Sequence, residues 1–427
     1  MFGPSVVAGR SPDGVAEAAG TGPAACALGM APGDASPRAR HAAQAKAADN
    51  DGAARENGAR RMESARSIAS MHSGAACGQL IVGGFPGASL PPRFERALRE
   101  GRRGGAVLFK PNVEGGPYAV ASLTRHIRAC SEKPPLIAID QEGGRVARLR
   151  GPLLEVPPMR AVGAWGDVVL AERIARAVGL ELAALGFNVD FAPVLDVDTR
   201  AGNPVIGDRS FSADAETCAR LDAAWIRGLQ GAGVIATGKH FPGHGDTSSD
   251  SHVDLPTVQQ PRDRIDRVEL VPFRAGVVAG VGALMTAHVV YTAVDDARPA
   301  TLSPAVCTTL RDAIGFDGVL FSDDLEMAAI AARFTVEDAA VQAVAAGCDA
   351  LLVCWSEEKQ ERAFEALLRE SEQSPAFRAR CEQACRRVTA ARAATPVEHS
   401  DDEAIARVLG GRESREVAAE IARRTPR

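Results

Sequence analysis

The sequence contains few aromatic residues and no large excess of charge of either sign. Phe, Trp and Tyr together make up 4% of the 427 residues, so smaller apolar side chains must form most of the core. The net charge of −5 argues against a nucleic-acid-binding protein, which would normally carry a basic excess. No apolar run approaches the roughly 18–20 residues that a bilayer-spanning helix needs. Because apolar residues still make up 46% of the chain, it can bury a full core.

The nine cysteines are odd in number and scattered along the chain. Cys381 and Cys385 lie four residues apart on a predicted helix, but no CxxC pair and no Cys/His spacing typical of a zinc site is present. We therefore interpret the cysteines as buried thiols rather than as a disulfide or zinc framework. Free thiols are typical of a reducing compartment, and we expect a cytoplasmic protein.

Composition divides the chain into three parts. Residues 1–72 are rich in Ala, Gly, Arg and Pro without apolar periodicity, which predicts a disordered low-complexity tail. This tail lacks the apolar segment of about 7–15 residues that a signal peptide requires. Residues 73–395 carry the folded domain. Residues 396–427 form a charged C-terminal extension, with helices predicted over Asp402–Leu409 and Arg412–Arg424.

Short apolar runs alternate with longer amphipathic helical patterns from Gly78 onward. The runs are apolar throughout, which is typical of parallel strands that are buried on both faces. Eight such units predict a single-domain α/β fold of the (β/α)8 TIM-barrel type, with a doubly wound open sheet as the alternative. The eight predicted strands are Gln79–Val82, Ala106–Phe109, Leu136–Asp140, Asn188–Ala192, Val234–Lys239, Ala283–Ala287, Val319–Ser322 and Ala350–Val353. The main predicted helices are Val168–Leu185, Ala215–Gln230, Ser303–Ile314, Val336–Ala346 and Phe377–Thr395.

Polar side chains gather at the carboxyl ends of four predicted strands. Asp140 ends the third strand, Lys239 and His240 the fifth, His288 the sixth, and an Asp323-Asp324 pair the seventh. Barrel enzymes place their active sites at this end of the strands. We therefore expect an active site here. His288 could line this site, and a purely structural role for it is an equal alternative.

The segment that follows the fifth predicted strand holds three of the eight histidines. Its Pro and Gly residues exclude a helix. A metal site is one interpretation, with His240, His244, Asp246, Asp250 and His252 as possible ligands, but no His-x-His at an early strand would complete it. Acid/base chemistry is a second interpretation, because Asp250 could orient and charge-stabilise the imidazole of His252. A loop held together by its own polar groups is the third.

Three motifs carry a resemblance to a known family. KHFPGHGDTSSDSHVDLP, preceded by IDQEGGRVARLR and followed by FSDDLEM, resembles glycoside hydrolase family 3. Within that family the chain is similar to the single-domain bacterial β-N-acetylglucosaminidases of cell-wall recycling. The likeness covers roughly residues 78–393, with the motifs in the same order. It leaves out the tail, and it leaves out the second domain of the family's larger members.

The resemblance implies a retaining mechanism with a covalent glycosyl-enzyme intermediate. It assigns the nucleophile to Asp323 and an acid/base dyad to Asp250 and His252. The chemistry of the residues agrees, because a retaining glycosidase needs one carboxylate to attack the anomeric carbon and one group to protonate the leaving oxygen. Asp324 is an alternative nucleophile, but side-chain alternation along a strand directs it elsewhere.

The resemblance also implies the substrate and its contacts. We expect hydrolysis of terminal β-linked N-acetylglucosamine from peptidoglycan-derived muropeptides by a monomer, with no metal or other cofactor and no nucleic-acid or membrane partner. The alternatives are another β-glycosidase, a β-glycoside phosphorylase, or a non-catalytic sugar-binding protein. For Asp196 and Asp198, which follow the fourth predicted strand, the sequence favours a structural role. The residues implied to bind the sugar are Asp140, Arg148, Arg209, Lys239 and His240.

Overall fold

Eight parallel strands close into a barrel in the computed structural model, which describes residues 74–251, 254–395 and 400–425. The tail predicted over residues 1–72 and the predicted catalytic residue His252 lie outside the described residues. The order around the barrel is β1-β13-β12-β9-β7-β6-β3-β2, which confirms the TIM-type fold and rules out an open sheet. Each predicted apolar run supplies one strand. The barrel strands are β1 (Ile81–Gly83), β2 (Gly105–Leu108), β3 (Leu136–Ile139), β6 (Val189–Asp190), β7 (Ile235–Phe241), β9 (Ala283–Thr286), β12 (Val319–Asp324) and β13 (Ala350–Val353).

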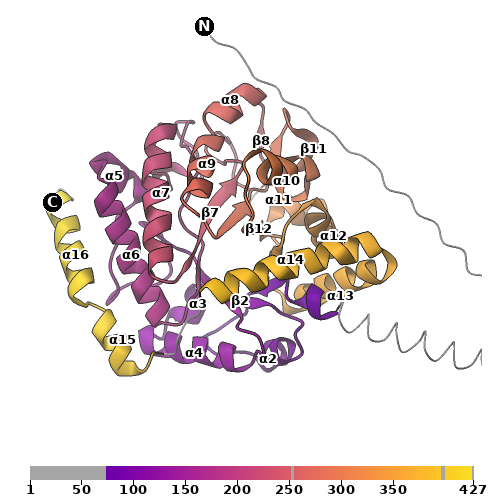
Figure 1. The fold of residues 1–427 in the computed structure, drawn as a ribbon, viewed down its shortest axis with the longest axis horizontal. Helices are drawn as coiled ribbons and strands as arrows, with labels where there is room; N and C mark the ends of the chain where they lie inside the picture. Colours follow the sequence, from indigo (N-terminus) through magenta and orange to yellow (C-terminus); the bar gives the residue numbers. More distant parts are fainter. Residues whose placement is uncertain (1–73, 252–253, 396–399, 426–427) are drawn as a thin grey trace, which may run out of the picture. The chain divides into compact units, whose positions relative to one another are not determined.

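Helices lie around these strands in Figure 1. In the part of the chain that the structure describes, no helix has both the length and the apolar character to cross a bilayer. The α-helices are α2 (Pro92–Arg99), α3 (Lys110–Val113), α4 (Pro117–Ala129), α5 (Met159–Trp165), α6 (Val168–Ala184), α7 (Ala215–Gly231), α8 (Arg262–Arg267), α9 (Leu270–Val278), α10 (Pro304–Thr308), α11 (Ala328–Ala331), α12 (Val336–Ala346), α13 (Glu357–Gln373), α14 (Pro375–Ala394), α15 (Asp402–Val408) and α16 (Arg412–Arg424).

One predicted helix is interrupted. The pattern over Ser303–Ile314 predicts a continuous helix, whereas α10 ends at Thr308 and a π-helical turn follows over Thr309–Ala313. The side chain of Arg311 donates to the carbonyl oxygens of Phe316 and Gly318 at 2.9 and 2.8 Å. These tertiary contacts, which no local periodicity encodes, accompany the change of helical pitch.

Side-chain alternation divides the core into an inner and an outer part. On β13, Ala350 and Leu352 belong to the apolar cluster inside the barrel, whereas Leu351 and Val353 belong to the cluster between strands and helices. The same alternation holds on the other strands because successive side chains of a strand point to opposite faces. Strands buried on both sides need apolar residues at every position, which is why the runs are visible in the sequence.

Two small sheets are built from segments that follow the carboxyl ends of barrel strands. The hairpin of β4 (Gln141–Gly143) and β5 (Val146–Ala147) comes directly after β3. A three-stranded sheet joins β8 (Thr257–Val258), β10 (Val290–Tyr291) and β11 (Asp295–Pro299). These additions lie in the βα segments, the part of a barrel that carries function.

The two C-terminal helices confirm the predicted helical segments. Both α15 and α16 contact α6, and Figure 1 shows α16 beside it. The hydroxyl of Ser414 donates to Glu181 Oε1 at 2.7 Å, and Arg424 pairs with Asp167 at 2.9 Å. Val417 is fully buried in this contact region. The C-terminal extension therefore packs on the barrel.

Candidate active site

A cavity of about 930 Å³ opens at the carboxyl end of the barrel strands. Phe191 of the inner core lines this cavity, and its ring meets that of the buried Phe321 edge to face with centroids 5.4 Å apart. Seven of the eight predicted site residues line this one cavity, and the eighth, His252, lies outside the described residues. The seven are Asp140, Arg148, Arg209, Lys239, His240, Asp250 and Asp323.

A chain of ion pairs runs along the base of the cavity. Lys239 Nζ lies 2.8 Å from Asp140 Oδ1 and 2.6 Å from Glu142 Oε1. At one end Arg148 donates to Asp140 at 2.9 Å. At the other end Arg209 grips both oxygens of Glu142, at 2.8 and 2.7 Å. The sequence analysis missed Glu142, although its place two residues after Asp140 in IDQEGGR was an available signal.

The charges of this network stabilise one another in spite of burial. Burial by itself would raise the pKa of Glu142, but Arg209 and Lys239 outweigh it and hold that pKa at about 2. In the same way Lys239 and Arg148 keep the pKa of Asp140 well below its usual value. Burial would lower the pKa of Lys239, yet its two carboxylates raise it overall. All of these groups are charged at neutral pH, and three cations face two carboxylates.

The pKa values of the neighbouring residues Asp323 and Asp324 are shifted in opposite directions. Burial would raise the pKa of Asp323, but His288 and His240 outweigh this effect and hold it below the usual value. Burial raises the pKa of Asp324 to about 7. Asp324 also reaches the cavity lining, but its Oδ1 accepts from the backbone N–H groups of Glu326 and Cys354 at 3.1 and 3.2 Å. Asp323 is therefore the more readily ionised carboxyl group of the pair.

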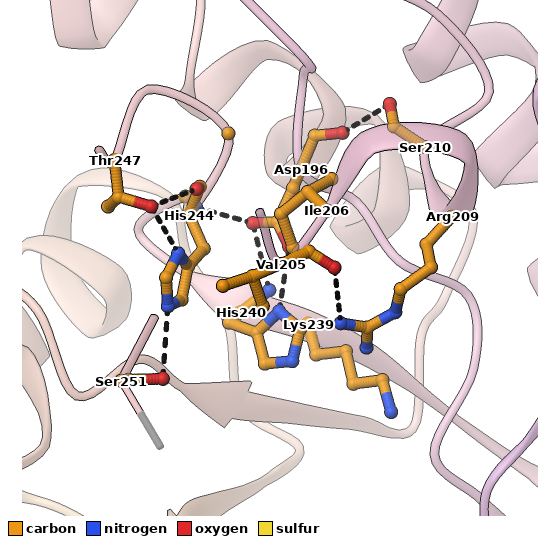
Figure 2. Close-up of polar contacts among 12 residues, drawn as sticks. Asp196, Val205, Ile206, Arg209, Ser210, Lys239, His240, His244, Thr247 and Ser251 are labelled. Carbon is orange, nitrogen blue, oxygen red and sulfur yellow. Dashed lines mark hydrogen bonds and ion pairs between the residues drawn. The ribbon is translucent and has the colours of Figure 1, made fainter. Parts of the chain in front are cut away.

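Asp196 holds the histidine-containing loop in place (Figure 2). Its Oδ1 accepts from the backbone N–H groups of His240 and His244 at 3.1 and 2.6 Å. Its Oδ2 lies 2.7 Å from His240 Nδ1. Since a carboxylate only accepts hydrogen bonds, Nδ1 of His240 carries the proton. The structural role that the sequence favoured for Asp196 thus serves the site directly.

His244 positions Ser251, the residue between the two members of the predicted dyad. Thr247 Oγ1 donates to the carbonyl oxygen of His244 at 3.0 Å, so it accepts from His244 Nδ1 at 2.7 Å. His244 Nε2 is then unprotonated and accepts from Ser251 Oγ at 3.1 Å (Figure 2). Burial lowers the pKa of His244 to about 4, in agreement with a neutral ring. The sequence analysis considered His244 only as a metal ligand.

The loop that carries His244 is also fixed by contacts of its backbone with Asn203 and Val197. Asn203 Nδ2 donates to the carbonyl oxygens of His244 and Gly245, both at 3.0 Å. A Cβ atom at Gly245 would collide with the carbonyl oxygen of Val197, so only glycine fits there. Within the described residues, the ligand atoms of His240, His244, Asp246 and Asp250 do not converge as a metal cluster.

The comparison with known proteins identifies the family. Residues 85–391 match the family described as "Glycosyl hydrolase family 3 N terminal domain". The chain belongs to glycoside hydrolase family 3. It is therefore a glycoside hydrolase, as the three sequence motifs indicated.

Relatives within family 3 share much of the chain. It is 44% identical over 275 residues to a β-hexosaminidase of Thiobacillus denitrificans, a match that covers 63% of this chain and 76% of the relative. It is 43% identical over 289 residues to a β-hexosaminidase of Pseudomonas aeruginosa, a match that covers 66% of this chain and 84% of that relative.

Solved structures of the family agree in fold. A family 3 β-N-acetylglucosaminidase from Paenibacillus sp. FPU-7 superposes with a TM-score of 0.76 and 40% identity, over 82% of this chain and 68% of that one. NagZ from Neisseria gonorrhoeae in complex with N-trifluoroacetyl-D-glucosamine superposes with a TM-score of 0.66 and 30% identity. This match covers 81% of this chain and 98% of that one.

The structure also places His288, whose role the sequence left open, and Asp198, for which the sequence favoured a structural role. His288 is fully buried, with Nε2 2.9 Å from the carbonyl oxygen of Asp324 and Nδ1 2.8 Å from Thr301 Oγ1. It lies behind the end of β12, where it lowers the pKa of Asp323. Asp198 pairs with Arg160 at 2.6 Å, which is a structural contact.

Asp190 is a buried carboxyl group under the ionic network. Its Oδ1 accepts from the backbone N–H of Gln141 at 2.9 Å, and among the described residues its Oδ2 has no hydrogen-bond partner. Burial raises the pKa of Asp190 to about 8, more than the nearby charge of Lys239 lowers it. The group is therefore protonated at neutral pH.

Asp190→Asn should flatten the pH dependence of stability. The folded chain holds the Asp190 proton up to about pH 8, whereas the unfolded chain releases it near about pH 4. Unfolding between these values releases a proton, so the contribution of Asp190 is present at low pH and is lost as the pH rises toward 8. As the pH rises through this range, the free energy of unfolding of the wild type should fall by up to about 1.4 kcal/mol per pH unit relative to that of the variant. Chemical unfolding of both proteins from pH 5 to 8 measures this, and parallel curves would refute it.

The side chains of His244 and Ser251 should act as one unit through their hydrogen bond. His244→Phe keeps an aromatic ring but removes the acceptor, and Ser251→Ala removes the donor. Each variant should lower kcat/KM by roughly tenfold to a hundredfold, because small displacements of catalytic groups are costly. The double variant should be no worse than the worse single one. His126→Ala, at an exposed histidine on α4, is the control. If the loss of kcat/KM in the double variant equals the product of the two single losses, the two side chains act separately.

Proposed function

We propose that this glycoside hydrolase is a retaining β-N-acetylglucosaminidase that removes terminal β-linked N-acetylglucosamine from muropeptides. The observation that carries the proposal is the cavity that Asp323 shares with Asp250 and with the ion-paired Asp140, Lys239 and Arg148. The lowered pKa of Asp323 supports its role as nucleophile. A nucleophile, a loop with an acid/base dyad and a set of fixed polar groups for sugar hydroxyls are what a retaining glycosidase needs.

The proposed reaction has two steps at the anomeric carbon. Asp323 attacks that carbon, and His252 with Asp250 protonates the leaving oxygen, so a covalent glycosyl-enzyme forms and the aglycone departs. His252 then removes a proton from water, which attacks the same carbon and releases the sugar with retained configuration. The imidazole suits this exchange because its ordinary pKa lies near neutrality. Every step uses groups of the protein, so the proposal includes no cofactor.

The ionic network is proposed to bind the sugar in the cavity. Asp140 is the acceptor for hydroxyl hydrogens, while Lys239 and Arg148 donate to oxygens of the ring substituents. Because each group is already paired, the network is preorganised and needs little rearrangement when the sugar binds. Arg209 acts through Glu142, which it holds against Lys239.

The remaining parts of the proposal concern substrate source and compartment. The names of the relatives support an N-acetylhexosamine as the substrate, and the likeness to cell-wall-recycling enzymes supports a muropeptide fragment. All eight described cysteines, from Cys77 to Cys385, are free thiols, which supports a reducing compartment and thus the cytoplasm. We propose a monomer.

Turnover of defined glycosides tests the proposed function. The wild type should hydrolyse an aryl β-N-acetylglucosaminide and not the matching β-glucoside, and NMR should detect the β-anomer of N-acetylglucosamine first. First release of the α-anomer would contradict retention. Formation of the sugar phosphate in phosphate buffer would contradict hydrolysis, and sugar binding without turnover would contradict an enzyme.

His252→Ala should slow the reaction in proportion to the need for protonation of the leaving group. Positioned acid/base groups contribute about 10²–10⁴-fold, and this full loss is expected for alkyl and sugar leaving groups. Activated phenolates need little protonation, so their first step should be nearly spared and the glycosyl-enzyme should accumulate. Rates for leaving groups of graded pKa measure this. An equal loss for all leaving groups would show that His252 only binds or supports the structure.

A further inference from the structure

An aromatic pair lies at the cavity wall apart from the ionic network. Phe109 follows β2 and Trp355 follows β13, and their rings stack with centroids 4.7 Å apart and planes inclined by 24°. Both side chains line the cavity, and Trp355 is 61% exposed. In the barrel β1 separates β2 from β13, so the two rings meet beyond the end of β1. Gly84 follows β1, and a Cβ there would collide with the carbonyl oxygen of Cys354, the residue before Trp355, and would lie 3.2 Å from the Phe109 ring.

The backbone that carries Trp355 is tied to the segment that carries the nucleophile. Glu326, three residues after Asp323, accepts from the N–H groups of Trp355 and Ser356 at 2.6 and 3.0 Å. The other carboxylate oxygen of Glu326 lies 3.1 Å from Lys359 Nζ. The position of the exposed indole is therefore fixed relative to the reacting carboxylate.

The other ring is tied to the sugar-binding network. The backbone N–H of Phe109 donates to Asn112 Oδ1 at 2.7 Å. The guanidinium carbon of Arg148 lies 5.8 Å from the centroid of the Phe109 ring, and the same side chain donates to Asp140. The aromatic pair thus continues the wall of the cavity outward from the residues that are proposed to bind the first sugar.

The cavity is large enough to leave room for more than one sugar ring. About 930 Å³ lies near the upper end of the roughly 300–1,000 Å³ found for small-molecule sites. A rigid aromatic face offers large contact area at little conformational cost, and it matches the apolar face of a pyranose ring. Lys110 follows Phe109 directly, is exposed and also lines the cavity. Its ammonium suits an anionic substituent on that ring.

We propose that Trp355, supported by Phe109, is the platform on which the leaving sugar ring stacks, and that Lys110 binds a carboxylate on that ring. The inference rests on the proposed function and deepens it by naming the residues that hold the leaving sugar. Glu326 is the positioning residue of the platform.

Substrates with and without a second ring test the platform. The probes are N-acetylglucosaminyl-anhydro-N-acetylmuramic acid, chitobiose and N-acetylglucosaminyl fluoride, whose leaving group has no ring. For each probe kcat/KM reports the steps up to departure of the leaving group. Trp355→Ala should lower kcat/KM for the two disaccharides at least about tenfold more than for the fluoride. Trp355→Phe should recover most of the loss, and Tyr118→Ala, at an exposed aromatic residue outside the cavity lining, is the matched control.

Lys110→Gln tests the second half of the proposal. It should lower kcat/KM for the acidic disaccharide several-fold more than for neutral chitobiose, and added salt should narrow the wild-type preference between them. Equal losses on the fluoride and the disaccharides in Trp355→Ala would overturn the platform. An unchanged preference in Lys110→Gln would overturn the carboxylate contact. Failure of the wild type to release N-acetylglucosamine from any probe would instead contradict the proposed function, and this inference with it.

Discussion

The ammonium group of Lys239, shared between Asp140 and Glu142, is the contact on which the site depends. Removing one partner from a buried ion pair leaves an uncompensated charge and typically costs about 3–5 kcal/mol. Here one cation compensates two carboxylates, and each carboxylate also holds an arginine, Arg148 or Arg209. The network therefore joins the segments that follow β3 and β6 to the carboxyl-terminal part of β7. The charged groups that are proposed to bind the sugar are therefore the same groups that hold the loops together.

Local environment gives neighbouring carboxyl groups different tasks. The imidazoles of His288 and His240 hold the pKa of Asp323 below its usual value, whereas burial raises the pKa of Asp324, which accepts from the backbone N–H of Cys354 after β13. Asp190, under the network, keeps its proton for the same reason of burial. Separation of pKa values by environment is how one site can contain both a nucleophile and neutral supporting acids. The order of residues in FSDDLEM thus places the proposed nucleophile, Asp323, beside Asp324 and Glu326, which hold the adjoining loop.

The sequence was sufficient for the barrel and for the residues at its rim, for a physical reason. Strands buried on both faces must be apolar throughout, so each run is visible locally, and groups such as Asp140 and Asp323 stand directly at strand ends. Contacts between distant segments leave no such local pattern. Glu142 acquires its role only when Arg209 reaches it, and His244 only when Ser251 folds back onto its ring. The π-helical turn after α10 likewise depends on tertiary contacts of Arg311.

The central claim is that the buried charges leave Asp323, and not its neighbour, as the carboxylate that bonds to the sugar. Mass spectrometry of the wild type treated with a slow fluorinated N-acetylglucosaminide tests it most directly, with peptide fragmentation to locate the attached sugar. The account predicts one N-acetylglucosaminyl-derived adduct, carried by Asp323. An adduct on Asp324, or continued turnover with no covalent adduct, would contradict it.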